Sequence, residues 1–197
     1  MSEKIKPIAI YLPQFHPIPE NNEWWGNGFT EWTNVTKAKP LFEGHYQPHL
    51  PADLGFYDLR LEEARVAQET LAKSKGIHGF CYYHYWFNGK RVLEDPLKRK
   101  LNNIKEDLPF MMCWANENWT RVWNGGESDV LLKQEYSDED DFNHIQELIT
   151  YFNDEDMNLS ISGNKENIDI ASLGRYANEL QNQLKLVSGT DLVSIFG

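Results

Sequence analysis

Three short segments of the sequence combine aromatic rings with amide, imidazole and carboxyl groups. They contain, in turn, Gln14 and His16; His84, Tyr85 and Trp86; and Trp114, Asn116, Glu117 and Trp119. Aromatic rings stack against the C–H faces of a pyranose, while the polar groups hydrogen bond with its hydroxyls. The combination is typical of a carbohydrate site. The alternative, ordinary polar loop residues beside packed aromatic rings, stays open at this point.

Two carboxyl groups are candidates for catalysis in such a site. Cleavage or transfer at a glycosidic bond normally uses a pair of carboxyl groups placed around the anomeric carbon. Glu117 lies in the third segment, and Glu31 lies in the aromatic run Phe-Thr-Glu-Trp. Either carboxylate can instead accept hydrogen bonds from a backbone amide or a sugar hydroxyl.

Each of the three segments follows an apolar run that predicts a buried strand, at residues 7–12, 77–83 and 109–115. Helices are predicted between them, over residues 58–74 and 92–103. In the first helix the apolar residues form one stripe, made of Leu61, Ala64, Val66, Ala67 and Leu71. Alternating strands and helices predict an α/β fold with a parallel sheet. The polar segments are therefore expected at one edge of the sheet, where the carboxyl ends of the strands lie.

The rest of the chain divides into a long loop, a helix and a tail. Residues 18–50 have no periodicity and several prolines and glycines, which predicts a long functional loop. Ser137 is a good N-cap for a helix that reaches about residue 152. We therefore expect two parts, the α/β part at 1–153 and an acidic tail at 154–197. The tail contains one predicted helix, 168–186, and a short terminal strand, 191–196.

Charge and composition exclude several classes of function. The chain has 197 residues and a net charge of −11, and residues 124–197 hold 15 acidic but only four basic side chains. Because an acidic protein without a basic cluster repels phosphate backbones, we expect no nucleic-acid partner. The sequence lacks an apolar run long enough to span a membrane and lacks a signal peptide, so we expect a cytoplasmic location.

The sequence predicts no metal and no cofactor. Cys81 and Cys113 lie within apolar runs and are expected to be buried reduced thiols. The spacing Asp138-x-Asp140 superficially fits a metal and nucleotide-sugar signature, but the first turn of a helix explains it better. No phosphate-binding glycine loop is present.

Three long runs resemble the WbsX-type glycosyltransferase family. They are IAIYLPQFHPIPENNEWWGNGFTEWTNVTKAKPLFEGHYQPHLPADLGFYDLR, GIHGFCYYHYWFNGKRVLEDPL and PFMMCWANENWTRVWNG. That family is related to the endo-mannosidases of glycoside hydrolase family 99 and occurs in gene clusters for bacterial O-antigen and capsule. The resemblance covers about residues 6–153. It implies the N-terminal part of a (β/α)8 barrel, a TIM-like fold, and action on glycosidic bonds of lipopolysaccharide or capsule.

The resemblance also implies which residues line the sugar site. Glu117 is the candidate catalytic residue. The candidate substrate-binding residues are Gln14, His16, Trp24, Trp25, Glu31, Trp32, His84, Trp86, Asn116 and Trp119.

The sequence departs from the family in two ways. A complete barrel needs about 200 to 250 residues, whereas this chain has only three clear strands, so we expect a truncated, incomplete barrel. The related mannosidases also carry their acting carboxylates in a later Trp-Asn-Glu-Trp-x-Glu-Gly motif, which nothing here matches.

Two functional hypotheses remain. The chain is either an enzyme of polysaccharide assembly acting through Glu117, or a non-catalytic carbohydrate-binding remnant or half of a split enzyme. Expected partners are an oligosaccharide or polysaccharide, a second copy of the chain, or a complementing C-terminal half. For the isolated chain we expect weak oligosaccharide binding through Trp24, Trp25 and Trp119 without detectable turnover, and we expect helix 168–186 to pack on the sheet or on a partner.

Overall fold

A computed structural model describes residues 5–121 and 126–151 of the chain. The chain divides into two compact units. The first comprises Met1–Trp86 and Arg91–Asn116, and the second comprises Phe87–Lys90 and Glu117–Gly197. Each unit is described separately below.

The first unit is built on three parallel strands, β1 (Ile8–Tyr11), β2 (Gly79–Phe87) and β4 (Phe110–Trp114). The central strand β2 pairs with both of the others. The three predicted strands and their parallel arrangement are thus confirmed. β2 is longer than predicted, so His84, Tyr85 and Trp86 lie within the strand and not in a loop after it. Its extension pairs with β3 (Lys90–Val92) beyond a tight turn, in which Asn88 and Gly89 both have positive φ.

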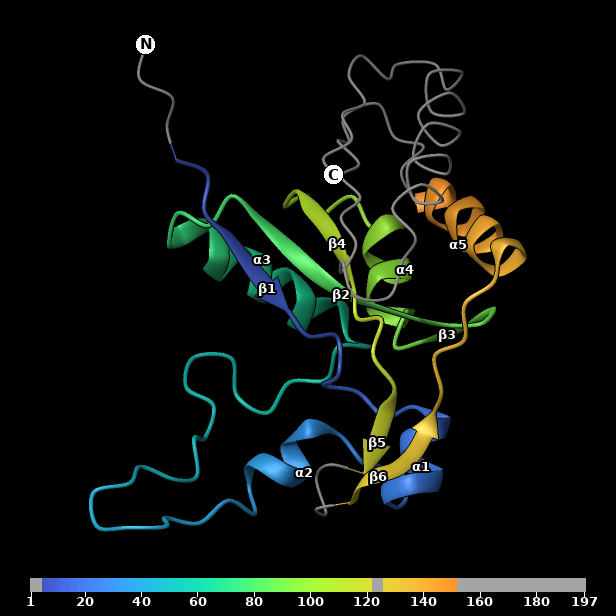
Figure 1. Ribbon diagram of the computed structural model, residues 1–197. Helices are drawn as coiled ribbons and strands as arrows, with labels where there is room; N and C mark the ends of the chain where they lie inside the picture. Colours follow the sequence, from blue (N-terminus) through green and yellow to red (C-terminus); the bar gives the residue numbers. More distant parts are fainter. Residues whose placement is uncertain (1–4, 122–125, 152–197) are drawn as a thin grey trace. The chain divides into compact units, whose positions relative to one another are not determined.

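Two helices, α3 (Glu62–Ser74) and α4 (Asp95–Leu101), cover one face of this sheet (Figure 1). The Tyr11 hydroxyl of β1 donates a 2.7 Å hydrogen bond to Gln68 of α3. The Lys100 ammonium of α4 lies 5.9 Å from the centroid of the Phe110 ring of β4. Both helices were predicted, with ends a few residues longer than observed.

Glycine is required at the start of β2. The amide of Phe80 donates a 2.9 Å hydrogen bond to the carbonyl oxygen of Pro109, which brings the two backbones close together. A Cβ atom on Gly79 would lie 2.7 Å from that oxygen. A side chain at position 79 would therefore push β2 away from the segment that leads into β4.

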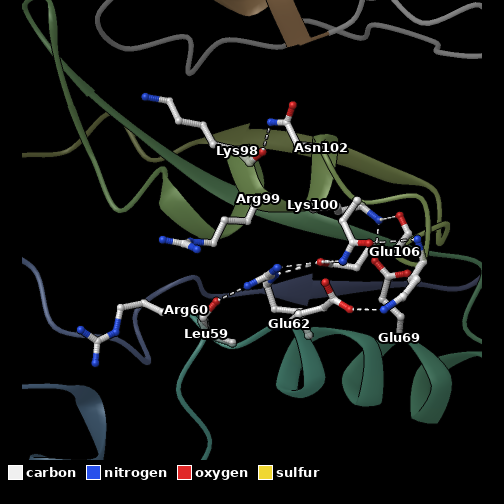
Figure 2. Close-up of polar contacts among 12 residues, drawn as sticks. Leu59, Arg60, Glu62, Glu69, Lys98, Arg99, Lys100, Asn102 and Glu106 are labelled. Atoms are coloured by element: carbon white, nitrogen blue, oxygen red, sulfur yellow. Dashed lines mark hydrogen bonds and ion pairs between the residues drawn. The ribbon is translucent and has the colours of Figure 1, made fainter.

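Buried ion pairs hold α3 and α4 together (Figure 2). The guanidinium of Arg65 makes three contacts of 2.8 to 3.0 Å with the Glu106 carboxylate, and these side chains are 5% and 0% exposed. Lys100 of α4 pairs with Glu69 of α3 and also donates a 2.8 Å hydrogen bond to the Glu106 carbonyl oxygen. Glu69 in turn accepts a 2.8 Å hydrogen bond from the amide of Leu108.

The predicted apolar stripe of α3 is therefore not its buried face. The buried residues of the helix are Arg65, Glu69 and Ala72, whereas Leu61, which precedes the helix, is 55% exposed. The charged side chains can be buried because each has an oppositely charged partner and further hydrogen bonds.

The opposite face of the sheet exposes apolar side chains. Ile8 and Ile10 of β1 are 49% and 69% exposed, and Met111 of β4 is 36% exposed. Cys81 and Cys113 are free thiols on this face, and the prediction that both are buried is wrong because Cys113 is exposed and Cys81 is only partly covered. The described strands form no closed barrel, so the (β/α)8 fold stays a prediction.

The segment predicted as a structureless loop contains two short helices, α1 (Pro19–Trp25) and α2 (Glu31–Val35). Pro19 begins α1, where its fixed φ suits a first helical turn. Thr30 and Thr33 form a reciprocal capping box at α2. Both helices are too short to produce a periodic pattern in the sequence.

The second unit contains an antiparallel pair, β5 (Trp119–Arg121) and β6 (Gly126–Leu132), followed by α5 (Asp138–Tyr151). The sequence reading missed the pair of strands. The helix α5 and its N-cap were predicted. The cap is confirmed, since the Ser137 hydroxyl accepts a 3.1 Å hydrogen bond from the amide of Asp140. The predicted helix 168–186 and strand 191–196 lie outside the described residues. Within the described ranges, none of the helices has the length and hydrophobicity to cross a membrane.

Candidate functional site

The carboxyl ends of the three parallel strands are joined by hydrogen bonds. Gln14, three residues beyond β1, donates a 2.9 Å hydrogen bond from Nε2 to the hydroxyl of Tyr85 on β2. The amide of Ala115 donates a 2.9 Å hydrogen bond to the carbonyl oxygen of His84. The indole of Trp114 donates a 3.3 Å hydrogen bond to the carbonyl oxygen of Trp86. The residues predicted from the three strand ends within the first unit are therefore brought to one edge of the sheet.

Tyr85 is a protonated hydroxyl at this edge. The side chain is 5% exposed, and burial raises its pKa to about 12. The hydrogen bond from Gln14 opposes this shift, and the charge of Glu31 adds to it. The hydroxyl thus accepts a hydrogen bond from Gln14 and keeps its own proton at neutral pH.

An aromatic cluster surrounds Phe15, the residue after Gln14. The ring centroid of Phe15 lies 4.6 Å from that of Trp32 and 5.2 Å from that of Tyr57. The indole N–H of Trp32 donates a 2.9 Å hydrogen bond to the carbonyl oxygen of Tyr57. Trp32 thus packs within the protein, and its N–H is already occupied. Phe15 and Tyr57 were not singled out from the sequence, since single aromatic residues in a loop carry no periodic signal.

His16 is buried without hydrogen-bond partners. Its side chain is 2% exposed, and neither ring nitrogen has a partner. Burial lowers the pKa of the imidazole, although the carboxylates of Asp95 and Asp58 act in the opposite direction. The ring is therefore held neutral, and a ligand reaches it only if neighbouring side chains move.

The two candidate carboxyl groups have different surroundings. Glu31, the first residue of α2, is partly buried, and burial raises the pKa of its carboxyl group. Glu117 is exposed and belongs to the second unit. A carboxyl group with a raised pKa holds its proton closer to neutral pH, which is the property a proton donor needs. The sequence did not reveal that Glu31 is partly buried and Glu117 exposed, because the burial of Glu31 depends on how α2 packs.

The other predicted sugar-binding residues differ in accessibility. His84 and Trp86 are 4% and 5% exposed, so they belong to the interior. Trp24 and Trp25 of α1, and Asn116 beyond β4, are partly exposed. The three partly exposed residues can offer a ring face or an amide to a ligand without rearrangement.

Trp119 lies at the start of β5 in the second unit. Its ring centroid is 5.7 Å from that of Phe87, with the rings nearly perpendicular, and the residue is partly exposed. The preceding Asn118 accepts a 2.6 Å hydrogen bond from the amide of Gln134, which follows β6. The side chain of Asn118 thus holds the chain where β5 begins.

No group of three His, Cys, Asp or Glu side chains that could hold a metal ion occurs in the described part of the chain. The described part of the first unit instead offers partly exposed amides and rings and a carboxyl group of raised pKa. These groups suit a polyhydroxylated, uncharged ligand.

Sequence comparison agrees with this chemistry. A family described as glycosyltransferase WbsX matches residues 7–165. The chain belongs to the WbsX glycosyltransferase family. It is also 53% identical, over 144 residues, to a protein named WxcX from Xanthomonas campestris pv. campestris strain B100, which is described as uncharacterized. A WxcX from a second strain of the same pathovar matches equally.

The aligned region covers 73% of this chain but 21% of either WxcX, so the chain spans about a fifth of the length of these relatives. No solved structure matches the chain.

Proposed function

We propose that this WbsX-family protein acts on carbohydrate during assembly of a bacterial cell-surface polysaccharide, such as O-antigen or capsule, in the cytoplasm. The reaction is glycosyl transfer or cleavage of a glycosidic bond. The observation that carries the proposal is the hydrogen bond between Gln14 and Tyr85 at the carboxyl edge of a parallel sheet. Active sites of (β/α)8 enzymes lie at this edge.

Sugar recognition is assigned to partly exposed groups of the first unit. The Gln14 amide, held by the buried Tyr85 hydroxyl, hydrogen bonds with sugar hydroxyls, and Asn116 supplies a further amide. Trp24 and Trp25 stack on the C–H face of a sugar ring. In the second unit, Trp119 is a separate candidate for stacking on a sugar ring. His16, His84, Trp86 and Trp32 hold these groups in place, since they are buried or already engaged with the protein.

Bond making and breaking is assigned to the carboxyl groups. Glu117 of the second unit is the proposed acting carboxylate. Glu31 of the first unit, whose pKa burial raises, is the alternative candidate for the proton donor.

A second candidate function is carbohydrate binding without turnover. It is favoured by the exposure of Glu117, which has none of the burial that marks Glu31. The acting carboxylates then come from a complementing C-terminal half or another polypeptide. In either case we propose that the parallel sheet is part of a (β/α)8 barrel. The sequential order of β1, β2 and β4, with α3 and α4 on one face, supports this.

The two functions are separated by assaying the full chain with nucleotide-sugars and mannosides, alongside Glu117→Gln and Glu31→Gln. Turnover by the wild type that is lost in Glu117→Gln establishes the enzyme. Sugar binding without turnover, unchanged in Glu117→Gln, establishes the binding protein. Glu43→Gln, which alters an exposed loop carboxylate, is the matched control and should behave as the wild type. Neither turnover nor binding with any sugar would reject both.

A further inference from the structure

Three sulfur-containing side chains share the face of the sheet that α3 and α4 leave uncovered (Figure 1). Cys81 of β2 is paired with Met111 of β4, and residues paired in neighbouring strands point to the same face of a sheet. Cys113 lies two residues beyond Met111 in β4, so the alternation of the strand returns its side chain to that face. The chain has two cysteines, and the fold brings both to this place.

The two thiols act on each other directly. Burial raises the pKa of the Cys81 thiol, and Cys113 raises it further, as a neighbouring charge and through a hydrogen bond between the two side chains. Side chains that hydrogen bond in this way can bind a single ion between them. Met111 lies beside Cys81 in the pairing of the strands, which adds a third sulfur atom.

The three side chains are open to solvent on one side. Cys113 is exposed, Met111 is 36% exposed, and Cys81 is partly covered. Ile10 of β1 is paired with Cys81 on the side away from Met111, so an apolar side chain flanks the cluster. An ion from solvent can therefore reach the sulfur atoms without a rearrangement of the sheet.

This set of ligands selects a soft cation. Thiolates and thioethers favour Cu(I), whereas carboxylates, carbonyls and water suit Mg²⁺ and Ca²⁺. The strands β1, β2 and β4 contain no aspartate or glutamate, so they offer a hard cation no carboxylate. Structural Zn²⁺ normally takes four ligands from cysteine, histidine and carboxylate side chains, and a thioether is not among them.

We propose that Cys81, Met111 and Cys113 bind one Cu(I) ion on the open face of the sheet, through two thiolates and one thioether. Each thiol gives up its proton as its sulfur binds the ion, so binding releases two protons and changes no oxidation state. The site differs from clusters of His, Cys, Asp and Glu, because one of its three ligands is a thioether. The assignment is independent of the proposed carbohydrate function, since none of the three side chains has a role in it.

Titration of the full chain with Cu(I) tests the site. It is done without oxygen and in competition with a coloured Cu(I) chelator. The wild-type chain should retain one ion per chain, and its mass in sedimentation should not change on binding. Retention of half an ion per chain together with a doubled mass would identify a site shared between two copies and overturn the proposal. Loss of all the Cu(I) to the chelator would overturn it too.

Single substitutions test the three ligands. Cys81→Ser and Cys113→Ser should each weaken Cu(I) binding about tenfold or more, because a thiolate ligand is lost. Met111→Leu keeps the size of the side chain but removes its sulfur, and it should also weaken binding. Met112→Leu is the matched control, since Met112 lies on the opposite face of the same strand, and it should bind as the wild type does. Wild-type affinity in any one of the first three variants would overturn the three-sulfur site.

A measurement on the unmodified chain keeps the test valid if a variant fails to fold. The wild-type chain is treated with iodoacetamide, and the added groups are counted by mass spectrometry. One equivalent of Cu(I) should slow alkylation of Cys81 and Cys113, whereas Mg²⁺ should leave it unchanged. Because the chain has no other cysteine, the count reports on this site alone. Equal rates of alkylation with and without Cu(I) would overturn the proposal.

Discussion

The amide of Gln14 and the hydroxyl of Tyr85 are joined by a 2.9 Å hydrogen bond, although 71 residues separate them in the sequence. The bond links the loop after β1 to the end of the central strand β2. It fixes the Gln14 amide, which is partly exposed and also carries a carbonyl oxygen and a second N–H. A sugar hydroxyl that meets this amide can therefore donate to its oxygen or accept from its second N–H.

Removing the Tyr85 hydroxyl is expected to cost stability and sugar affinity together. Tyr85→Phe loses the hydrogen bond from Gln14, which lowers the free energy of unfolding by about 1 kcal/mol. Tyr46→Phe, which removes the hydroxyl of a 67% exposed loop tyrosine, is the control. Urea denaturation and sugar titration measure both quantities. Equal behaviour of the two variants would show that the hydrogen bond has no role at the site.

His16 is expected to make stability depend on pH. Because burial lowers the pKa of His16 below its ordinary value of 6.5, the unfolded chain binds a proton more readily than the folded chain. The contribution to stability is present above pH 6.5 and is lost as the pH falls through the folded pKa. Urea midpoints measured between pH 7.5 and 5 should fall less steeply for His16→Leu than for the wild type. His78→Asn, a change at an exposed histidine, is the control and should show the pH dependence of the wild type. The same pH dependence in His16→Leu as in the wild type would contradict a buried, neutral imidazole at position 16.

Neutralising Glu106, the buried partner of Arg65, is expected to lower the free energy of unfolding far more than neutralising an exposed glutamate. Glu106→Gln leaves a buried guanidinium without its carboxylate and should lower the free energy of unfolding by about 3 to 5 kcal/mol. Glu135→Gln removes an exposed pair with Lys133 and should change stability little. The comparison is made by urea denaturation at neutral pH. A loss for Glu106→Gln as small as that for Glu135→Gln would mean that water reaches the Arg65 pair.

These buried charges also show what the sequence could not predict. The three parallel strands were predictable because each is a compact apolar run. Gln14 and Glu117 were predicted as site residues because each follows such a strand in the sequence. The burial of Arg65 could not be predicted, because its partner Glu106 is 41 residues away and charged helix residues normally face solvent. The strands β5 and β6 were missed because three residues at Trp119–Arg121 are too few for an alternating pattern.

Gly79 is expected to tolerate no side chain. In Gly79→Ala the new Cβ atom meets the Pro109 carbonyl oxygen at 2.7 Å, so the start of β2 must move. We expect a loss of about 1 to 3 kcal/mol in the free energy of unfolding, the usual cost of overpacking. Thermal denaturation of the full chain measures the loss. A melting temperature equal to that of the wild type would show that the two backbones separate readily.

Direct titration of the full chain with mannose-containing oligosaccharides, by isothermal calorimetry, tests the proposed carbohydrate site most directly. We predict weak, saturable binding by the wild type that is lost in Gln14→Ala with Trp25→Ala. Binding should be retained in Phe42→Ala, which removes a 66% exposed ring outside the site. Binding that is unchanged in the Gln14 and Trp25 variant, or absent from the wild type for every oligosaccharide, would contradict a carbohydrate site at the carboxyl edge of the sheet.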